Sequence, residues 1–434
     1  MRRLAVLGLL AVFGAGCTDR LATPGNCPGF CPGGDSLQTR DTILTAVISR
    51  DSSYRGFVAP HEAAVLLAAD VPGIDSRPMW VLSGIPALRT RFGTDTTTWP
   101  VAYVDSAKVF IHVARYDAAA SNLRLKLYHM PKTIDSTTTF ADVAGAFTDS
   151  LIDSLNVDSV LAMPNHHDTI TGDSIVVDTV NHTLTVIFKL DSAQVPLTLS
   201  DSGRQAFGLR VAADSLASIA VSTAGSVSGG PTLTWYLAAD SAGKRVPLTL
   251  PVPKNAPFPH LFVFNPGPAS LDTNLAVGGM PTARSLLRIA LPRFIRDSSF
   301  VVRATLLLVP SQAAQGIAAD SFIVEAQRVE ADFGGKSPLA IPRFSGDSAV
   351  GDTAGVLIGA TDTVRFEILP LVRLWQADTA APQAIMLRML SHGELATTFE
   401  GGTFAEIRFY SSRNAALRPA LRITYIPRFQ FGRQ

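Results

Sequence analysis

Residues 300–309 read FVVRATLLLV, and this stretch decides the fold class. Apolar and polar side chains alternate through much of it, as expected for a strand with one buried face. Similar runs occur at residues 123–129 (LRLKLYH), 183–190 (TLTVIFKL) and 404–410 (FAEIRFY). Clusters of Gly, Pro and Asp separate these runs and favour turns. The pattern predicts an all-β protein built from sandwich or jelly-roll domains.

The composition of the 434-residue chain supports this class. Residues of the AVILMFWYC set make up 47% of the chain, and the formal net charge is only +1. These values exclude a disordered chain and argue against a nucleic-acid partner, which would require a basic excess. Sixteen Asp residues are followed directly by Ser, a pair whose side chains stabilise turns. Arg far outnumbers Lys, and no motif accounts for that excess.

The chain also contains two related halves. Each half has a similar start, a similar pair of middle strands and a similar close. The starts are residues 64–82 (AVLLAADVPGIDSRPMWVL) and 274–291 (NLAVGGMPTARSLLRIAL). The closing segments PTLTWYL and PALRITYI end at Leu237 and Ile426. Four correspondences in the same order predict two copies of one β-sandwich in tandem.

A proline-rich segment, PVPKNAPFPH at residues 251–260, suggests the boundary between the halves, because proline cannot donate to a sheet ladder. The predicted domains are a signal peptide at 1–16, a Pro/Gly-rich tether at 17–41, a first sandwich at 42–250, the linker at 251–260, a second sandwich at 261–428 and a tail at 429–434.

The second half resembles the DNRLRE-type β-sandwich, a bacterial extracellular module classed among carbohydrate-binding modules. The similarity covers about 270–426. It is carried by Gly278-Gly279, by 284–288 (RSLLR), 304–308 (ATLLL), 371–375 (LVRLW) and 411–413 (SSR), and by 419–425 (PALRITY). The resemblance implies a sandwich fold, an extracellular location and a polysaccharide ligand.

The N-terminus has the features of an export signal. Arg2 and Arg3 precede an apolar run from Leu4 to Phe13, and small residues then lead to Cys17. This start resembles the lipobox of bacterial lipoproteins, in which the cysteine is acylated; cleavage by an ordinary signal peptidase is the alternative. Thr18 stands where inner-membrane retention typically requires Asp, so the resemblance implies the outer membrane.

The two remaining cysteines favour the lipoprotein interpretation. Cys27 and Cys31 lie close together in CPGFCPGG, a natural local disulfide in an oxidising compartment. Their pairing leaves Cys17 unpaired, and lipidation accounts for it. A metal site at these two thiols would lack the further ligands of a tetrahedral centre.

No motif predicts catalysis or a cofactor. Gly34-Asp35-Ser36-Leu37 matches the nucleophile tetrapeptide of one esterase family, but it follows a Pro/Gly tether and no Asp-x-x-His supplies a base. His166-His167-Asp168, with Asp173, Asp178 and His182, is the one His-rich cluster, which we interpret as a polar hairpin rather than a metal site. We therefore expect a non-enzymatic protein.

A polysaccharide ligand would require an exposed aromatic ring. Trp80, Trp235 and Trp375 follow apolar patterns and are expected in the core. Trp99, in TDTTTWPV, is the best loop candidate for ligand binding, and Tyr54 and Tyr116 are weaker ones. The sequence therefore predicts a lipid-anchored cell-envelope protein with binding or display sandwiches. The alternative is a structural or assembly component that contacts other envelope proteins.

Overall fold

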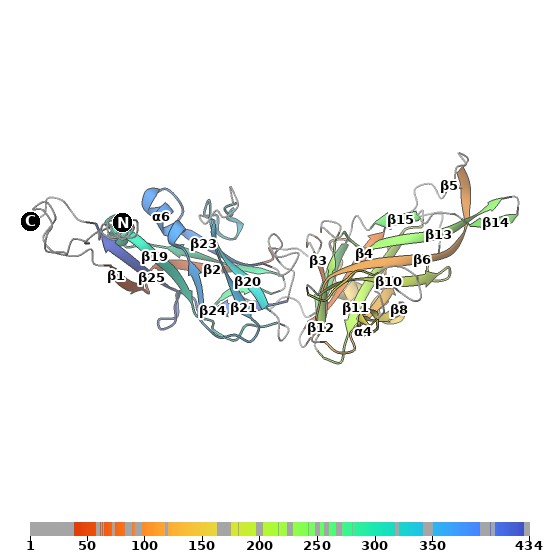
Figure 1. Cartoon of the computed structure of the whole chain (residues 1–434), viewed down its shortest axis with the longest axis horizontal. Helices are drawn as coiled ribbons and strands as arrows, with labels where there is room; N and C mark the ends of the chain where they lie inside the picture. The colour runs from red at the N-terminus through yellow and green to blue at the C-terminus, as the bar shows by residue number, and fades with distance from the viewer. Residues whose placement is uncertain are drawn as a thin grey trace, which may run out of the picture.

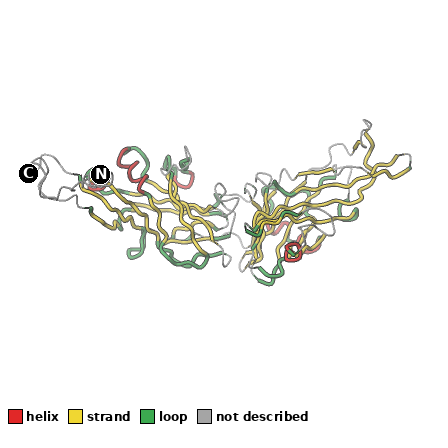
Figure 2. The backbone as a smooth tube through the Cα atoms, viewed as in Figure 1, coloured by secondary structure: helices red, strands yellow, loops and turns green. Residues whose placement is uncertain are grey.

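The computed structural model describes most of the chain between residues 39 and 428. The described residues are 39–57, 61, 63, 65–71, 74–82, 89–91, 98–117, 120–162, 175–180, 182–196, 203–215, 217–223, 229–241, 243–247, 252–255, 260–265, 271–279, 281–316, 321–341, 350–390, 400 and 404–428. Strands dominate, and a few short helices lie beside them (Figure 2). The predicted all-β, sandwich-like class is confirmed.

The strands form two units (Figure 1). We call them the outer sandwich, which contains the first and the last strands along the chain, and the inner sandwich, whose strands lie between them in the sequence. The outer sandwich has a four-stranded and a seven-stranded sheet. Its elements are β1 (Arg40–Leu44), β2 (Ile48–Arg55), β17 (Leu275–Gly278), β18 (Ala283–Ile289), α5 (Arg293–Arg296), β19 (Ser299–Leu308), β20 (Ser321–Arg328), β21 (Gly351–Leu357), β22 (Val364–Glu367), α6 (Leu369–Ala377), β23 (Ala384–Leu390), β24 (Glu406–Phe409) and β25 (Ala420–Pro427).

The inner sandwich is one curled 14-stranded sheet. Its elements are β3 (Val65–Val71), β4 (Ile74–Leu82), β5 (Arg89–Arg91), β6 (Thr98–Tyr116), β7 (Arg124–His129), α2 (Phe140–Val143), α3 (Ala146–Asp149), β8 (Leu151–Asn156), α4 (Val157–Leu161), β9 (Val177–Asp178), β10 (Thr183–Asp191), β11 (Gln205–Ala212), β12 (Ala217–Ser222), β13 (Thr232–Ser241), β14 (Lys244–Pro247), β15 (Val252–Asn255) and β16 (His260–Asn265).

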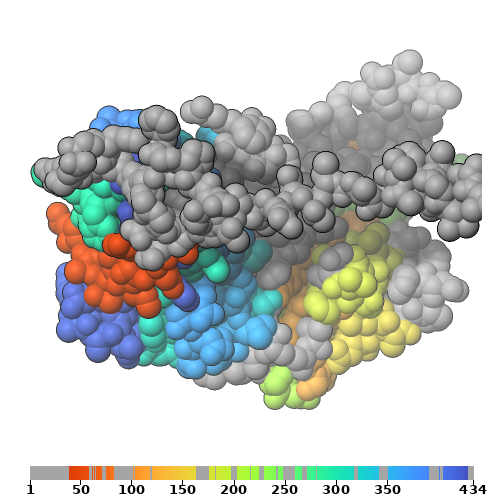
Figure 3. Space-filling model, turned by 60° about the vertical axis from the view of Figure 1, so that its left-hand side comes forward, coloured from red at the N-terminus to blue at the C-terminus, as the bar shows by residue number. Residues whose placement is uncertain are grey.

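The pairing of the first two strands changes the domain boundaries. β1 pairs with β25, and β2 pairs with β18 along its whole length, so both belong to the outer sandwich. Figure 3 shows the N-terminal segment against residues from the C-terminal end of the chain. The expected first domain at 42–250 therefore does not match the strand pairing. The chain begins the outer sandwich, builds the whole inner sandwich, and then returns to finish the outer one.

The predicted linker at 251–260 is also corrected by the pairing. β15 pairs with β13, and β16 pairs with β4, so this segment completes the inner sandwich instead of leaving it. Pro253 lies within β15, which pairs with one strand only, and an edge strand tolerates a residue without an N–H.

The two bodies nevertheless share one plan, as their sequences suggested. The order β4-β11-β7-β8 in the inner sandwich matches β18-β23-β20-β21 in the outer one. β6 pairs with β10 and β13, as β19 pairs with β22 and β25. A buried serine marks the equivalence. Ser76 donates to the carbonyl of Leu67 at 2.6 Å, and Ser285 donates to that of Ala276 at 2.7 Å, each nine residues earlier.

Each body has its own apolar core. Trp80 and Trp235 are fully buried in the inner core, and Trp375 in the outer one, which confirms the expectation for all three. Trp375 lies on helix α6 rather than on a strand, because Leu371, Val372 and Trp375 form one buried helical face. Its indole N–H donates to the carbonyl of Pro382 at 3.0 Å.

The segment after β7 covers the outside of the inner sandwich. Helices α2 and α3 place Phe140 and Phe147 beside the guanidinium of Arg77, at 4.4 and 5.1 Å from the ring centroids. Gly208 makes room for one of these rings, because a Cβ there would lie 2.6 Å from Phe147 Cζ. This segment accounts for part of the extra length of the first half.

Candidate functional site: the charged junction

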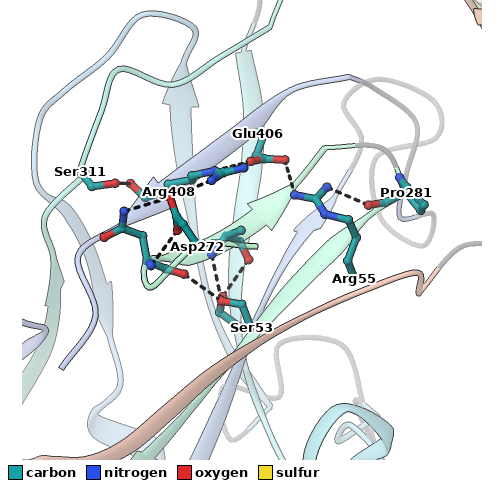
Figure 4. Close-up of polar contacts among 10 residues, drawn as sticks. Ser53, Arg55, Asp272, Pro281, Ser311, Glu406 and Arg408 are labelled. Atoms are coloured by element: carbon teal, nitrogen blue, oxygen red, sulfur yellow. Dashed lines mark hydrogen bonds and ion pairs between the residues drawn. The ribbon is translucent and has the colours of Figure 1, made fainter. Parts of the chain in front are cut away.

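The chain passes between the two sandwiches twice, after Arg55 and before residue 271. The residues beside these crossings form a cluster of ion-paired, mostly buried side chains in the outer sandwich, which we call the junction (Figure 4). Its side chains come from the end of β2, from the return segment at residues 271–274 and from β24. Three parts of the chain that are far apart in sequence are thus held at one place.

Glu406 is the centre of the junction. Arg55 donates through Nη2 to Glu406 Oε2 at 2.8 Å, and Arg408 donates through Nε to Oε1 at 2.6 Å. The side chains of all three are at most 12% exposed. Arg55 also donates to the carbonyl of Pro281, and Arg408 donates to Asp272 Oδ2 at 2.8 Å. The two cations and two carboxylates balance in charge. Arg55, Arg408 and Glu406 are buried, whereas the side chain of Asp272 is 44% exposed, so only part of the cluster loses its contact with solvent.

The electrostatics agree with these contacts. Burial alone would raise the pKa of Asp272, but hydrogen bonds from Asn274 and the guanidinium of Arg408 outweigh it, so the pKa lies below its ordinary value. Burial would lower the pKa of Arg408, but Glu406 and Asp272 raise it above its ordinary value. The ionised forms are therefore favoured on both sides of the contact.

Gly279 gives Glu406 its space. Its φ is +74°, a left-handed conformation that favours glycine, and it follows Gly278 at +86°. A Cβ at Gly279 would overlap Glu406 Oε2 and approach Arg55 Nη1. The Gly-Gly pair is thus required both by the turn from β17 to β18 and by the buried carboxylate next to it.

Serine hydroxyls extend the junction along β2. Ser53 Oγ and Ser285 Oγ share a hydrogen bond at 2.8 Å, and Ser53 also accepts from the backbone N–H of Ala276. Because Ser285 donates its one proton to Ala276, Ser53 donates to Ser285, and the carbonyl oxygen of Asn274, at 3.3 Å, is an alternative acceptor for the Ser53 proton. One side chain of β2 is thereby bound to both strands of the β17–β18 hairpin.

A second charged group lies beside the segment through which the chain leaves the outer sandwich. Arg284 forms a bidentate ion pair with Glu400, and its guanidinium lies 4.2 Å from the ring centroid of Phe57. The backbone N–H groups of Gly56 and Phe57 both donate to the carbonyl of Thr282. Residues 55–57 are therefore bound to the outer sandwich before the chain crosses to the inner one.

Chemically, the junction is suited to holding chain segments together. The carboxylates of Glu406, Glu400 and Asp272 each accept hydrogen bonds from arginine. Arginine remains protonated at physiological pH, so it can donate to these carboxylates throughout that range. Sequence reasoning did not identify the junction, and the Gly278-Gly279 pair was its one visible signal.

The residues predicted to bind ligand lie elsewhere. Trp99 is in strand β6 and is paired with Thr90 of β5, so its expected loop position is wrong. Tyr116 is buried and contacts His182 edge to face, with ring centroids 5.6 Å apart. Tyr54 is partly buried beneath Gly334 and Gly335. The ring of Tyr116 is therefore not exposed, and that of Tyr54 is covered in part.

The predicted metal and cysteine sites lie largely outside the described residues. Of the His-rich cluster, Asp178 accepts from the backbone N–H of Val180, and His182 has a left-handed φ of 56°. Within the described part of the chain, no group of three or more His, Cys, Asp or Glu could hold a metal ion. The remaining predicted residues outside this part are Cys17, Cys27, Cys31, Ser36, His166, His167, Asp168 and Asp173.

Two further observations complete the description. Within the ranges that the structure describes, no helix is long and apolar enough to cross a membrane. In comparisons with known proteins, no family model matches the chain and no curated protein sequence matches it. The resemblance to the DNRLRE-type sandwich thus stays a prediction.

Proposed function

We propose that the protein is a non-enzymatic, lipid-anchored component of the bacterial cell envelope that displays the inner sandwich toward polysaccharide. The observation that carries this proposal is the pairing of β1 with β25. It places the beginning of the folded chain on the outer sandwich, at the end away from the inner one (Figure 1). An anchor at Cys17 would then hold the outer sandwich near the membrane and leave the inner sandwich distant from it.

The side chains at the end where β1 begins support a membrane nearby. Phe300 is 52% exposed at the start of β19, and Phe294 of α5 is also exposed. Arg293, next to Phe294, is exposed as well. Aromatic side chains beside basic ones are suited to the interface of an anionic lipid surface.

The inner sandwich supplies the features expected of a glycan-binding surface. Tyr103 of β6 is 42% exposed, and the guanidinium of Arg245 lies 5.6 Å from its ring centroid. Trp99 is four residues earlier on the same strand, in the part of β6 that pairs with β5. An exposed aromatic ring beside a hydrogen-bond donor suits stacking against a sugar.

A structural role is the second candidate, and one observation favours it. Phe333 is 71% exposed and Ile341 is 81% exposed, both in the segment between β20 and β21 of the outer sandwich. Exposed apolar side chains on this segment would suit contact with another envelope protein.

The lipid anchor is tested by metabolic labelling with palmitate. We expect label on the intact chain and none on the Cys17→Ala variant. Label that persists in this variant, or none on either chain, would contradict the anchor.

Ligand binding is tested by a polysaccharide screen with the mature chain. Trp99→Ala and Tyr103→Ala should each weaken binding about five- to tenfold, as expected for loss of a stacked ring worth about 1–1.4 kcal/mol. Phe333→Ala removes a ring of the outer sandwich that is more exposed than that of Tyr103, and it should leave binding unchanged. Binding that depends on Phe333 would contradict a site on the inner sandwich, and no binding to any polysaccharide would favour the structural role.

A further inference from the structure

Each sandwich is completed by a pair of strands that adjoins the other sandwich in the sequence. β2 lies beside β18 of the outer sandwich, in the place that β16 occupies beside β4 of the inner one. Similarly, β1 occupies beside β25 the place of β15 beside β13. Along the sequence, however, β1 and β2 directly precede the body of the inner sandwich, and β15 and β16 directly precede that of the outer one. Each body is completed by the strand pair next to the other body.

The two crossings are equivalent in length. Nine residues connect β2 to β3, at 56–64, and nine connect β16 to β17, at 266–274. A simple tandem repeat and the observed arrangement therefore differ only in which body receives each strand pair. Within this single chain, each strand pair lies on the body that it does not adjoin in the sequence.

The contacts of β2 do not require that it belong to the same molecule as its acceptor. Ser53, Arg55 and Asp51 bind Ser285, Glu406 and the backbone N–H of Ser412, and all three of these partners lie in the outer body. β2 pairs with β18 alone, at the margin of its sheet. The same strand from another copy would make the same hydrogen bonds and ion pairs.

We propose that two copies of this chain form a strand-exchanged dimer, in which β1 and β2 of each copy complete the outer sandwich of the other. The interface is the acceptor edge formed by β18 and β25, and the partner is a second copy. Exchange of identical elements creates a two-fold symmetric dimer with few new contacts, so it is favoured by protein concentration. This inference does not depend on the lipid anchor or on a polysaccharide ligand.

The test is disulfide trapping between two full-length single-cysteine chains, in a background in which Cys17, Cys27 and Cys31 are replaced by Ser. Ser53→Cys and Ser285→Cys chains are mixed at high concentration, partly unfolded in denaturant, refolded and oxidised. Because residues 53 and 285 are direct antiparallel partners, a disulfide between them can form when β2 of one chain lies on β18 of the other. We expect a cross-linked heterodimer whose yield rises with protein concentration.

A matched control replaces the acceptor by Ser154→Cys, an exposed position on β8 of the inner sandwich. This mixture should give only the background of random collisions. Arg50→Cys mixed with Arg288→Cys, a second pair of direct partners, repeats the test at more exposed positions should the first pair fail to fold. Absence of a heterodimer above the Ser154→Cys background in both pairs, with a monomeric mass by light scattering for the unmodified chain, would overturn the proposal.

Discussion

The two sandwiches share a strand order but differ in the ion pairs that join their strands. Every Glu within the described residues forms an ion pair with Arg, and all of these lie in the outer sandwich: Glu325, Glu330, Glu367, Glu400 and Glu406. In the described part of the inner sandwich, the carboxylates that pair with Arg include those of Asp75 and Asp105. The outer sandwich is built from two distant pieces of chain, whereas the inner one is continuous.

This difference gives a physical reason for the excess of Arg over Lys. Arg presents a planar fork that can bind a carboxylate through two hydrogen bonds, which Lys cannot do. Arg284 and Arg288 of β18 bind Glu400 and Asp332 in this way. The ion pair between Arg422 and Asp41 joins β25 to β1, more than 380 residues apart. Directional pairs of this kind help to specify which distant strands meet.

The largest expected effect compares two glycines with the same backbone conformation. Gly279 of the outer sandwich and Gly243 of the inner one have φ values of +74° and +76°. A Cβ at Gly279 would overlap Glu406, whereas none of the described atoms lies within 4 Å of a Cβ at Gly243. We expect Gly279→Ala to cost about 3 kcal/mol and Gly243→Ala about 1 kcal/mol.

Denaturant unfolding of both variants measures this difference. Equal losses would mean that the left-handed φ alone sets the cost and that the junction around Glu406 adds nothing.

The second comparison concerns the buried tryptophans. The indole N–H of Trp375 donates to Pro382, whereas that of Trp235 has no hydrogen-bond partner among the described residues. Trp375→Phe and Trp235→Phe both lose buried apolar area. Trp375→Phe should cost about 1 kcal/mol more in the free energy of unfolding, because the Pro382 carbonyl also loses its donor. Thermal denaturation of the two variants checks this, and a greater loss for Trp235→Phe would contradict it.

The third comparison uses the equivalent serines. Among the described residues, the Ser76 hydroxyl bonds Leu67, whereas the Ser285 hydroxyl bonds both Ala276 and Ser53. Ser285→Ala should therefore destabilise the protein more than Ser76→Ala, by about 0.5–1 kcal/mol. Urea midpoints of the two variants measure the difference. Identical midpoints would show that Ser53 gains nothing from Ser285 and would weaken the role assigned to β2.

The smallest effect is a difference in pH dependence. Burial lowers the pKa of His129 and of His260, both in the inner sandwich, and the charge of His61 contributes to the shift of His260. Below their ordinary pKa of 6.5 the unfolded state binds protons more readily than the folded state. Inner-sandwich stability should be complete above pH 6.5 and should decrease as the pH falls from there toward the folded-state pKa values.

Unfolding measured across this range, for the unmodified chain and for His129→Gln with His260→Gln, tests the assignment. The double variant should show a flatter profile. If the free energy of unfolding of the double variant changed with pH as steeply as that of the unmodified chain, groups other than His129 and His260 would be responsible.

The sequence predicted the strands better than it predicted their partners. Alternation is a local property, and the runs at 123–129, 183–190 and 300–309 correspond to β7, β10 and β19. β2, with the sequence ISRDSSYR, has little apolar alternation, and the two equivalent bodies offer it similar acceptors. The polar contacts of Ser53 and Arg55 that select the outer body join residues more than 200 positions apart, so no local pattern reveals them.

The junction was missed for the same reason. Glu406 and Arg408 look like ordinary polar positions of a strand that alternates with Ile407 and Phe409. Their ionic partners are Arg55 and Asp272, which lie before and after the whole inner sandwich in the sequence. Trp99 shows the converse, because its polar neighbours indicated a loop while pairing with β5 places it in a strand.

The central claim, that β2 belongs to the outer sandwich, is tested most directly by two competing disulfides within one chain. Ser76 and Ser285 are equivalent positions, and Ser53 lies beside Ser285 in this structure. In dilute monomer lacking other cysteines, Ser53→Cys with Ser285→Cys should oxidise to an intramolecular disulfide, identified by peptide mapping. Ser53→Cys with Ser76→Cys should remain reduced. A disulfide between positions 53 and 76 instead would mean that the sandwiches follow one another in tandem, and would contradict this account.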